Sequence, residues 1–113
     1  MTTVTVERVI DVPADKAWNV LADFAGFLNW AGGGEGSIET EGNGVGMIRH
    51  MDLPGLGKMA ERLDELNHED MILRYSLVHG EGTGMDEYAA RVHVEPVGST
   101  QCKLLWQGEY RAS

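Results

Sequence analysis

An arginine and a glutamate stand where the sequence pattern expects apolar side chains. Arg49 alternates with Met47 and Met51, and Glu61 alternates with Leu63, so in extended strands each charge shares a face with apolar neighbours. Burying an isolated charge is costly, so we expect the two side chains to pair. The guanidinium could anchor a ligand carboxylate or carbonyl as a fork-shaped donor, or the pair could fix strand register. The general behaviour of buried ion pairs favours the second role.

Four aromatic residues fall on the same predicted faces as other apolar side chains, namely Tyr75, Tyr88, Trp106 and Tyr110. In a pocket, a phenol supplies one oriented hydrogen bond within an apolar wall. The same residues could equally form plain core. The set therefore makes a pocket contact plausible only if the fold leaves a cavity.

Other reactive residue types lack the spacing that chemistry requires. The histidines lie on predicted polar faces, in a turn or near a loop, and none has a helical metal-ligand partner; they are His50, His68, His79 and His93. Cys102 is the only cysteine and alternates with apolar residues, which is typical of a small buried hydrophobe. We predict no metal and no cofactor, and we assign no catalytic residue.

The elements that must position these residues are mostly strands. Val4 and Val6 alternate with polar residues, which predicts a strand over 2–10. Period-two patterns and turn residues predict further strands near 36–42, 45–53, 58–67, 71–80, 86–97 and 100–111. Asn43-Gly44 predicts a two-residue hairpin between the first two of these. Short turns between consecutive strands indicate an antiparallel meander.

One helix is predicted between the first strand and this meander. It occupies about 13–24, where Pro13 suits a first turn and one apolar face is formed by Ala17, Val20, Leu21 and Phe24. A second short helical turn is predicted around Phe27, Leu28 and Trp30. Strand, helices and then a meander indicate an α+β fold. One amphipathic helix is a thin cover for the apolar face of so many strands.

The composition excludes several functions. The chain has 113 residues, which suits a single domain over 1–113. Its 18 acidic and 9 basic residues give a net charge of −9, which would repel nucleic acid. No apolar run is long enough to span a bilayer, and residues 1–8 lack the pattern of a signal peptide. We therefore expect no nucleic-acid partner, no membrane span and a cytoplasmic location.

Several segments together resemble the polyketide cyclase/dehydrase and lipid-transport family of the START (Bet v 1-like, SRPBCC) superfamily. They are VIDVPADKAWNVLADFAGFLNW, GVGMIRHMDLPG, ERLDELNHEDMILRYSLVHG and EYAARVHVEPVGSTQCKLLWQGEY, and they follow the family order over nearly the whole chain. The resemblance implies a helix-grip fold, in which an antiparallel sheet curls around a long C-terminal helix and encloses an apolar cavity. Here the sequence ends after the last predicted strand, so we expect that helix to be absent.

The resemblance implies binding of a small hydrophobic, lipid- or polyketide-like ligand on the concave sheet face. The alternatives are an enzyme of the cyclase/dehydratase type and a protein-interaction module that uses the uncovered sheet face. The expected ligand-binding residues are Trp30, Met47, Arg49, Glu61, Tyr75, Leu77, Tyr88 and Trp106. Because a large exposed apolar patch is unusual in a monomer, we also expect a homodimer.

Overall fold

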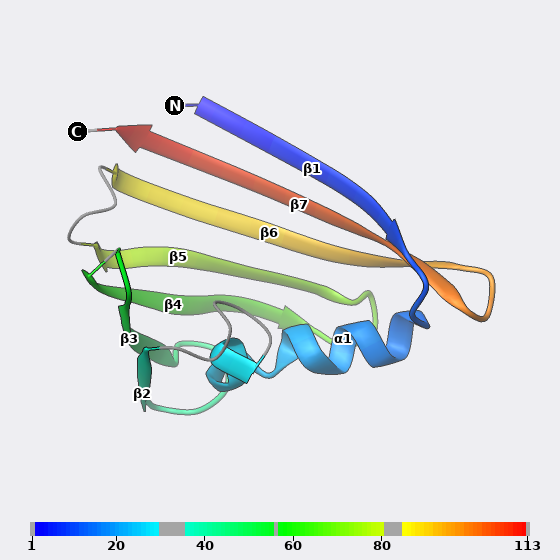
Figure 1. The fold of residues 1–113 in the computed structure, drawn as a ribbon, viewed down its shortest axis with the longest axis horizontal. Coiled ribbons are helices and arrows are strands. Elements are labelled where there is room, and N and C mark those ends of the chain that lie inside the picture. The colour runs from blue at the N-terminus through cyan, green and yellow to red at the C-terminus, as the bar shows by residue number, and fades with distance from the viewer. Residues whose placement is uncertain (1, 30–35, 56, 81–84, 113) are drawn as a thin grey trace.

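The computed structural model describes residues 2–29, 36–55, 57–80 and 85–112. In chain order the elements are β1 (Thr2–Ile10), α1 (Ala14–Ala22), the 3-10 helix η1 (Phe24–Asn29), β2 (Ser37–Glu41), β3 (Ile48–Leu53), β4 (Gly57–Asn67), β5 (Ile72–Gly80), β6 (Met85–Val97) and β7 (Gln101–Ala112) (Figure 1). The predicted strands are confirmed to within three residues at each end. The short helical turn at Phe27 and Leu28 is confirmed as η1, and Trp30 lies outside the described residues.

All seven strands form one antiparallel sheet in the order β1-β7-β6-β5-β4-β3-β2. Strands β2 to β7 make the predicted meander. Strand β1 adds to the far side of β7, with Thr2 opposite Tyr110 and Ile10 opposite Cys102. The first and last strands therefore lie side by side, as the blue and red strands in Figure 1 show.

Helix α1 lies against one face of the sheet and contacts β6 and β7 (Figure 1). We call this the inner face. It carries the buried side chains of Leu63, Leu73, Tyr75, Ala90, Val92, Val94 and Cys102, which form the core together with buried residues of α1 and η1. Because apolar residues alternate with polar ones along each strand, the opposite face is left largely polar. No helix of the described residues is long and apolar enough to cross a membrane.

The buried side of α1 differs from the predicted one. Ala14, Ala17 and Trp18 are buried, whereas Val20 is 50% exposed. The helix ends at Ala22, and η1 then turns Phe24 into the core by a separate route. The prediction of one continuous helical face from Ala17 to Phe24 was therefore wrong for Val20, and it missed Trp18.

The hairpin between β2 and β3 also differs from the prediction. Glu41 pairs with Ile48, so the connection spans 42–47 rather than two residues at Asn43-Gly44. The backbone N–H of Gly46 donates to the carbonyl of Leu63 at 2.7 Å, which holds this loop against β4 instead of β2. Val45, which the predicted strand over 45–53 includes, lies in this loop and is 59% exposed.

One polar contact fixes α1 to the turn between β4 and β5. The indole Nε1–H of the buried Trp18 donates to Nδ1 of His68 at 3.0 Å, and the two rings meet edge to face at 5.8 Å. The turn is itself fixed, because Asn67 Oδ1 accepts a hydrogen bond from the N–H of Asp70. His68, which sequence reasoning placed in a turn without a role, thus satisfies a buried donor.

Replacing His68 with Phe should lower the free energy of unfolding by about 1–3 kcal/mol, because the Trp18 N–H would keep its burial and lose its acceptor. His68→Gln, which retains an acceptor, should recover part of this loss. Urea denaturation of the two variants and the wild type measures the difference. Equal stability of His68→Phe and the wild type would show that the contact contributes nothing.

Candidate functional site: a closed and an open half of the inner face

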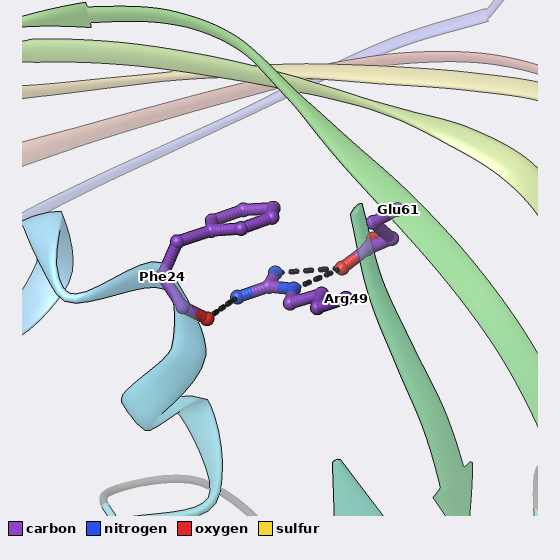
Figure 2. A network of polar contacts seen from close by, with 3 residues as sticks. All are labelled: Phe24, Arg49 and Glu61. Atoms are coloured by element: carbon purple, nitrogen blue, oxygen red, sulfur yellow. Dashed lines mark hydrogen bonds and ion pairs between the residues drawn. The ribbon is translucent and has the colours of Figure 1, made fainter. Parts of the chain in front are cut away.

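The predicted pair of Arg49 and Glu61 forms on the inner face. The two residues are direct cross-strand partners on β3 and β4, which places both side chains on one side of the sheet. Arg49 Nε and Nη2 donate to Glu61 Oε1 at 3.0 and 2.6 Å, and Nη1 donates to the carbonyl oxygen of Phe24 at 3.2 Å (Figure 2). Arg49 is 5% exposed and Glu61 is 8% exposed. The pair therefore fastens η1 to the sheet.

Aromatic rings complete the surroundings of Arg49. The guanidinium carbon lies 3.8 Å from the centre of the Phe24 ring and 5.2 Å from that of Tyr75, which are distances at which cation–π attraction operates. The space left beside Arg49 is about 10 Å³, too small for anything larger than a water molecule. We call this part of the inner face, covered by α1 and η1, the closed half.

Tyr75 belongs to the closed half and is 7% exposed. Burial, followed by the negative charge of Glu61, raises the pKa of its phenol well above the ordinary value of 10.0. The phenol therefore stays protonated well into the alkaline range, and it is a weaker proton donor than an ordinary tyrosine. Just above pH 10, the phenol is therefore neutral in the folded chain and ionised in the unfolded chain.

Because the pKa of Tyr75 is raised in the folded state, its contribution to stability is complete below about pH 10 and falls as the pH rises further. Tyr75→Phe removes the ionisable group. We expect its free energy of unfolding to fall less steeply above pH 10 than that of the wild type. Urea titrations between pH 8 and 11.5 give both slopes. Parallel curves would contradict the assignment.

The other half of the inner face is open. A hollow of about 300 Å³ lies over β1, β7 and β6, and its lining is almost entirely apolar: Val4, Val6, Tyr88, Trp106, Gly108 and Tyr110. Val4 and Val6 are 48% and 51% exposed although they face the same side as the core. Trp106 stands between the halves, since it lines both this hollow and the small space beside Arg49.

The structure thus divides the expected ligand-binding residues. Tyr88 and Trp106 line the open hollow, whereas Arg49, Glu61 and Tyr75 lie in the closed half. Met47 packs against the core, and Leu77 is partly buried opposite Glu61. Neither lines the hollow, and Trp30 lies outside the described residues.

Sequence reasoning missed three hollow-lining residues and left a fourth outside the expected set. Val4 and Val6 reach the hollow because β1 pairs with β7, a connection between chain ends that local patterns do not reveal. Gly108 stands between the bulky residues Trp106 and Tyr110 on the same face of the predicted strand. This pattern could have indicated the hollow from the sequence. Tyr110 belongs to the predicted aromatic set but not to the expected ligand-binding residues.

Other chemistry-bearing residues do not assemble. Within the described parts of the chain, no three His, Cys, Asp or Glu side chains are placed to hold a metal ion. His50 and His79 line a groove on the opposite face of the sheet, with Glu39, Asp52 and Lys58 as well as apolar side chains. Cys102 is fully buried, and burial raises the pKa of its thiol.

The sequence model of the family described as "Polyketide cyclase / dehydrase and lipid transport" matches residues 1–113. The chain belongs to this family. A search of curated proteins finds no match.

Solved structures agree on the fold. Norcoclaurine synthase from Thalictrum flavum, solved with dopamine and hydroxybenzaldehyde, is 25% identical with a TM-score of 0.81 over 98% of this chain and 69% of its own. A Thermobifida fusca protein is 20% identical with a TM-score of 0.84 over 100% of this chain and 76% of its own. The Zhui aromatase/cyclase of Streptomyces is 16% identical with a TM-score of 0.81 over 99% of this chain and 68% of its own.

These likenesses confirm the helix-grip fold expected from the sequence. The seven-stranded antiparallel sheet and its covering helix correspond to those of Bet v 1-like proteins. The last described element is β7. Family membership supports a ligand-binding or cyclase role for the chain.

Proposed function

We propose that the protein binds a small, neutral or weakly polar apolar ligand in the open hollow. The observation that carries this proposal is the lining itself, in which two valines and three aromatic residues surround a glycine in a space of about 300 Å³. That volume lies at the lower end of small-molecule sites. Phenol hydroxyls of Tyr88 and Tyr110 can supply directed hydrogen bonds within an apolar wall.

The charge of the chain supports a neutral ligand. A net charge of −9 disfavours nucleotides and other polyanions. The hollow itself is lined by no carboxylate, amine or imidazole among the described residues, so it holds no strong charge to pair with an ionic ligand.

The same lining favours binding over catalysis. A cyclase or dehydratase, the alternative that family membership allows, must move protons at the reacting centre. The titratable groups lining the hollow are two phenols, while Arg49 and Glu61 are paired with one another in the closed half. An enzymatic role would therefore need these tyrosines as the proton-transfer groups.

The neutral fluorescent dye Nile red tests the binding proposal. Its emission should rise with the wild-type protein and fall when 2-naphthol competes. Val6→Lys places a charge in the hollow and should weaken binding about tenfold or more. Val9→Lys is the matched control, because Val9 has a similar exposure of 54% on the opposite face of the same strand. If both variants weaken dye binding equally, the proposal is wrong. It is also wrong if the protein does not bind the dye and nucleotides stabilise it.

We propose a second copy of the chain as the macromolecular partner of the open half. Half-exposed Val4 and Val6, with Trp106 and Tyr110 beside them, form an apolar surface next to the part of the sheet that α1 and η1 cover. A two-fold pair would cover this surface on both chains and roof the hollow. Light scattering coupled to size exclusion should give twice the 12.4 kDa mass of one chain. A monomer mass that persists at high protein concentration would rule out the pair.

A further inference from the structure

A glycine sits at the centre of the open half without a conformational reason. Gly108 lies inside β7, is buried, and is not among the glycines with positive φ. Its backbone could therefore carry any residue. Glycine inside a strand weakens it, and such a position often marks a close approach by another group.

The approaching group is Tyr88. A Cβ atom built on Gly108 would lie 3.2 Å from the hydroxyl oxygen of Tyr88, 3.3 Å from its Cε2 and 3.5 Å from its Cζ. The phenol end of the ring thus rests on the bare backbone of β7. A methyl group at position 108 would force the ring to shift by a few tenths of an ångström.

The sheet register shows what this arrangement does to the hollow. Gly108 stands opposite Val4 on β1 and Ala90 on β6. The positions on either side of it along β7, on the same face, are Trp106 and Tyr110. Gly108 therefore forms a low floor between the aromatic side chains of Trp106 and Tyr110, and the phenol end of Tyr88 lies close to that floor.

We propose that Gly108 determines the size of ligand that the hollow accepts, with Tyr88 as the wall that it positions. Without a side chain at 108, the phenol end of Tyr88 lies close to the backbone of β7, and the space between Trp106 and Tyr110 stays open. Any side chain at this position both fills the floor and lifts Tyr88 into the hollow. This inference rests on the proposed binding function and names the residue that sets its selectivity.

Two neutral probes of different size test the inference, Nile red as the larger and 2-naphthol as the smaller. Gly108→Val should weaken Nile red binding about 10- to 200-fold, the range for small steric changes in an apolar pocket, and 2-naphthol binding only a few-fold. Tyr88→Ala in the Gly108→Val background should restore Nile red binding, because the lifted ring is then gone. Gly108→Ala should give an intermediate loss. It also supplies the test if Gly108→Val fails to fold.

The matched control is Ala89→Val, which adds the same kind of bulk on the exposed opposite face of β6, beside β7. It should bind both probes as the wild type does. If the wild type binds both probes and the Gly108 variants bind them with unchanged affinity, the inference is wrong while the binding function stands. The same conclusion follows if the Gly108 variants lose affinity for both probes equally and Tyr88→Ala does not restore it. If the wild type binds neither probe, the binding function and this inference both fail.

Discussion

Arg49→Met should destabilise the protein by about 3–5 kcal/mol, the cost of leaving one member of a buried ion pair without its partner. Glu61 is 8% exposed and accepts both of its hydrogen bonds from Arg49 at Oε1. The substitution also removes the hydrogen bond to the Phe24 carbonyl and the cation over its ring. Urea or thermal unfolding measures the loss.

Two comparisons show whether burial is the cause. Arg62→Met breaks an ion pair to Asp64 on the exposed face of β4 and should cost about 1 kcal/mol or less. Arg49→Met combined with Glu61→Leu replaces the buried pair with apolar side chains and should recover most of the stability. If Arg49→Met costs no more than Arg62→Met, the pair does not fasten η1 to the sheet.

Trp18→Ala should have an effect of similar size, about 3–5 kcal/mol, because it removes the largest buried side chain of α1. Only Ala14 and Ala17 would remain buried on that helix, so its hold on the inner face would weaken. We expect increased Nile red emission as the closed half becomes accessible. Chemical denaturation and dye titration give the two readouts.

The control for Trp18→Ala is Val20→Ala on the same helix, where the side chain is half exposed and should matter little. A small effect of Trp18→Ala, or one equal to that of Val20→Ala, would contradict the account of how α1 covers the sheet.

Most of the fold could be predicted from the sequence, because apolar and polar residues alternate along the strands. The strand over 2–10 was predicted with its observed bounds, and the remaining strands to within three residues. The buried face of the helix was harder to predict, because Ala17 and Leu21 belong to two possible apolar faces. One of these faces ends at Phe24, and the other contains Trp18. In the folded protein the face that contains Trp18 is buried, because Phe24 lies in η1 rather than in α1 and reaches the core from there.

The site was predictable only in part. A charge on an apolar strand face must be paired, so Arg49 and Glu61 could be joined before their geometry was known. The open hollow depends on β1 lying beside β7, a contact between residues about a hundred positions apart. Gly108 contributes by lacking a side chain, and such a feature acquires meaning only when its neighbour Tyr88 is in place.

A two-dimensional proton–nitrogen NMR titration with 2-naphthol tests most directly whether the hollow over β1, β7 and β6 binds the ligand. The signals that should move are the indole N–H of Trp106 and the backbone N–H groups of Val4, Val6 and Gly108, which surround the hollow. Signals from the groove at His50 and His79, on the opposite face, should stay in place. Unchanged signals around the hollow at saturating 2-naphthol, or changes confined to that groove, would contradict the account.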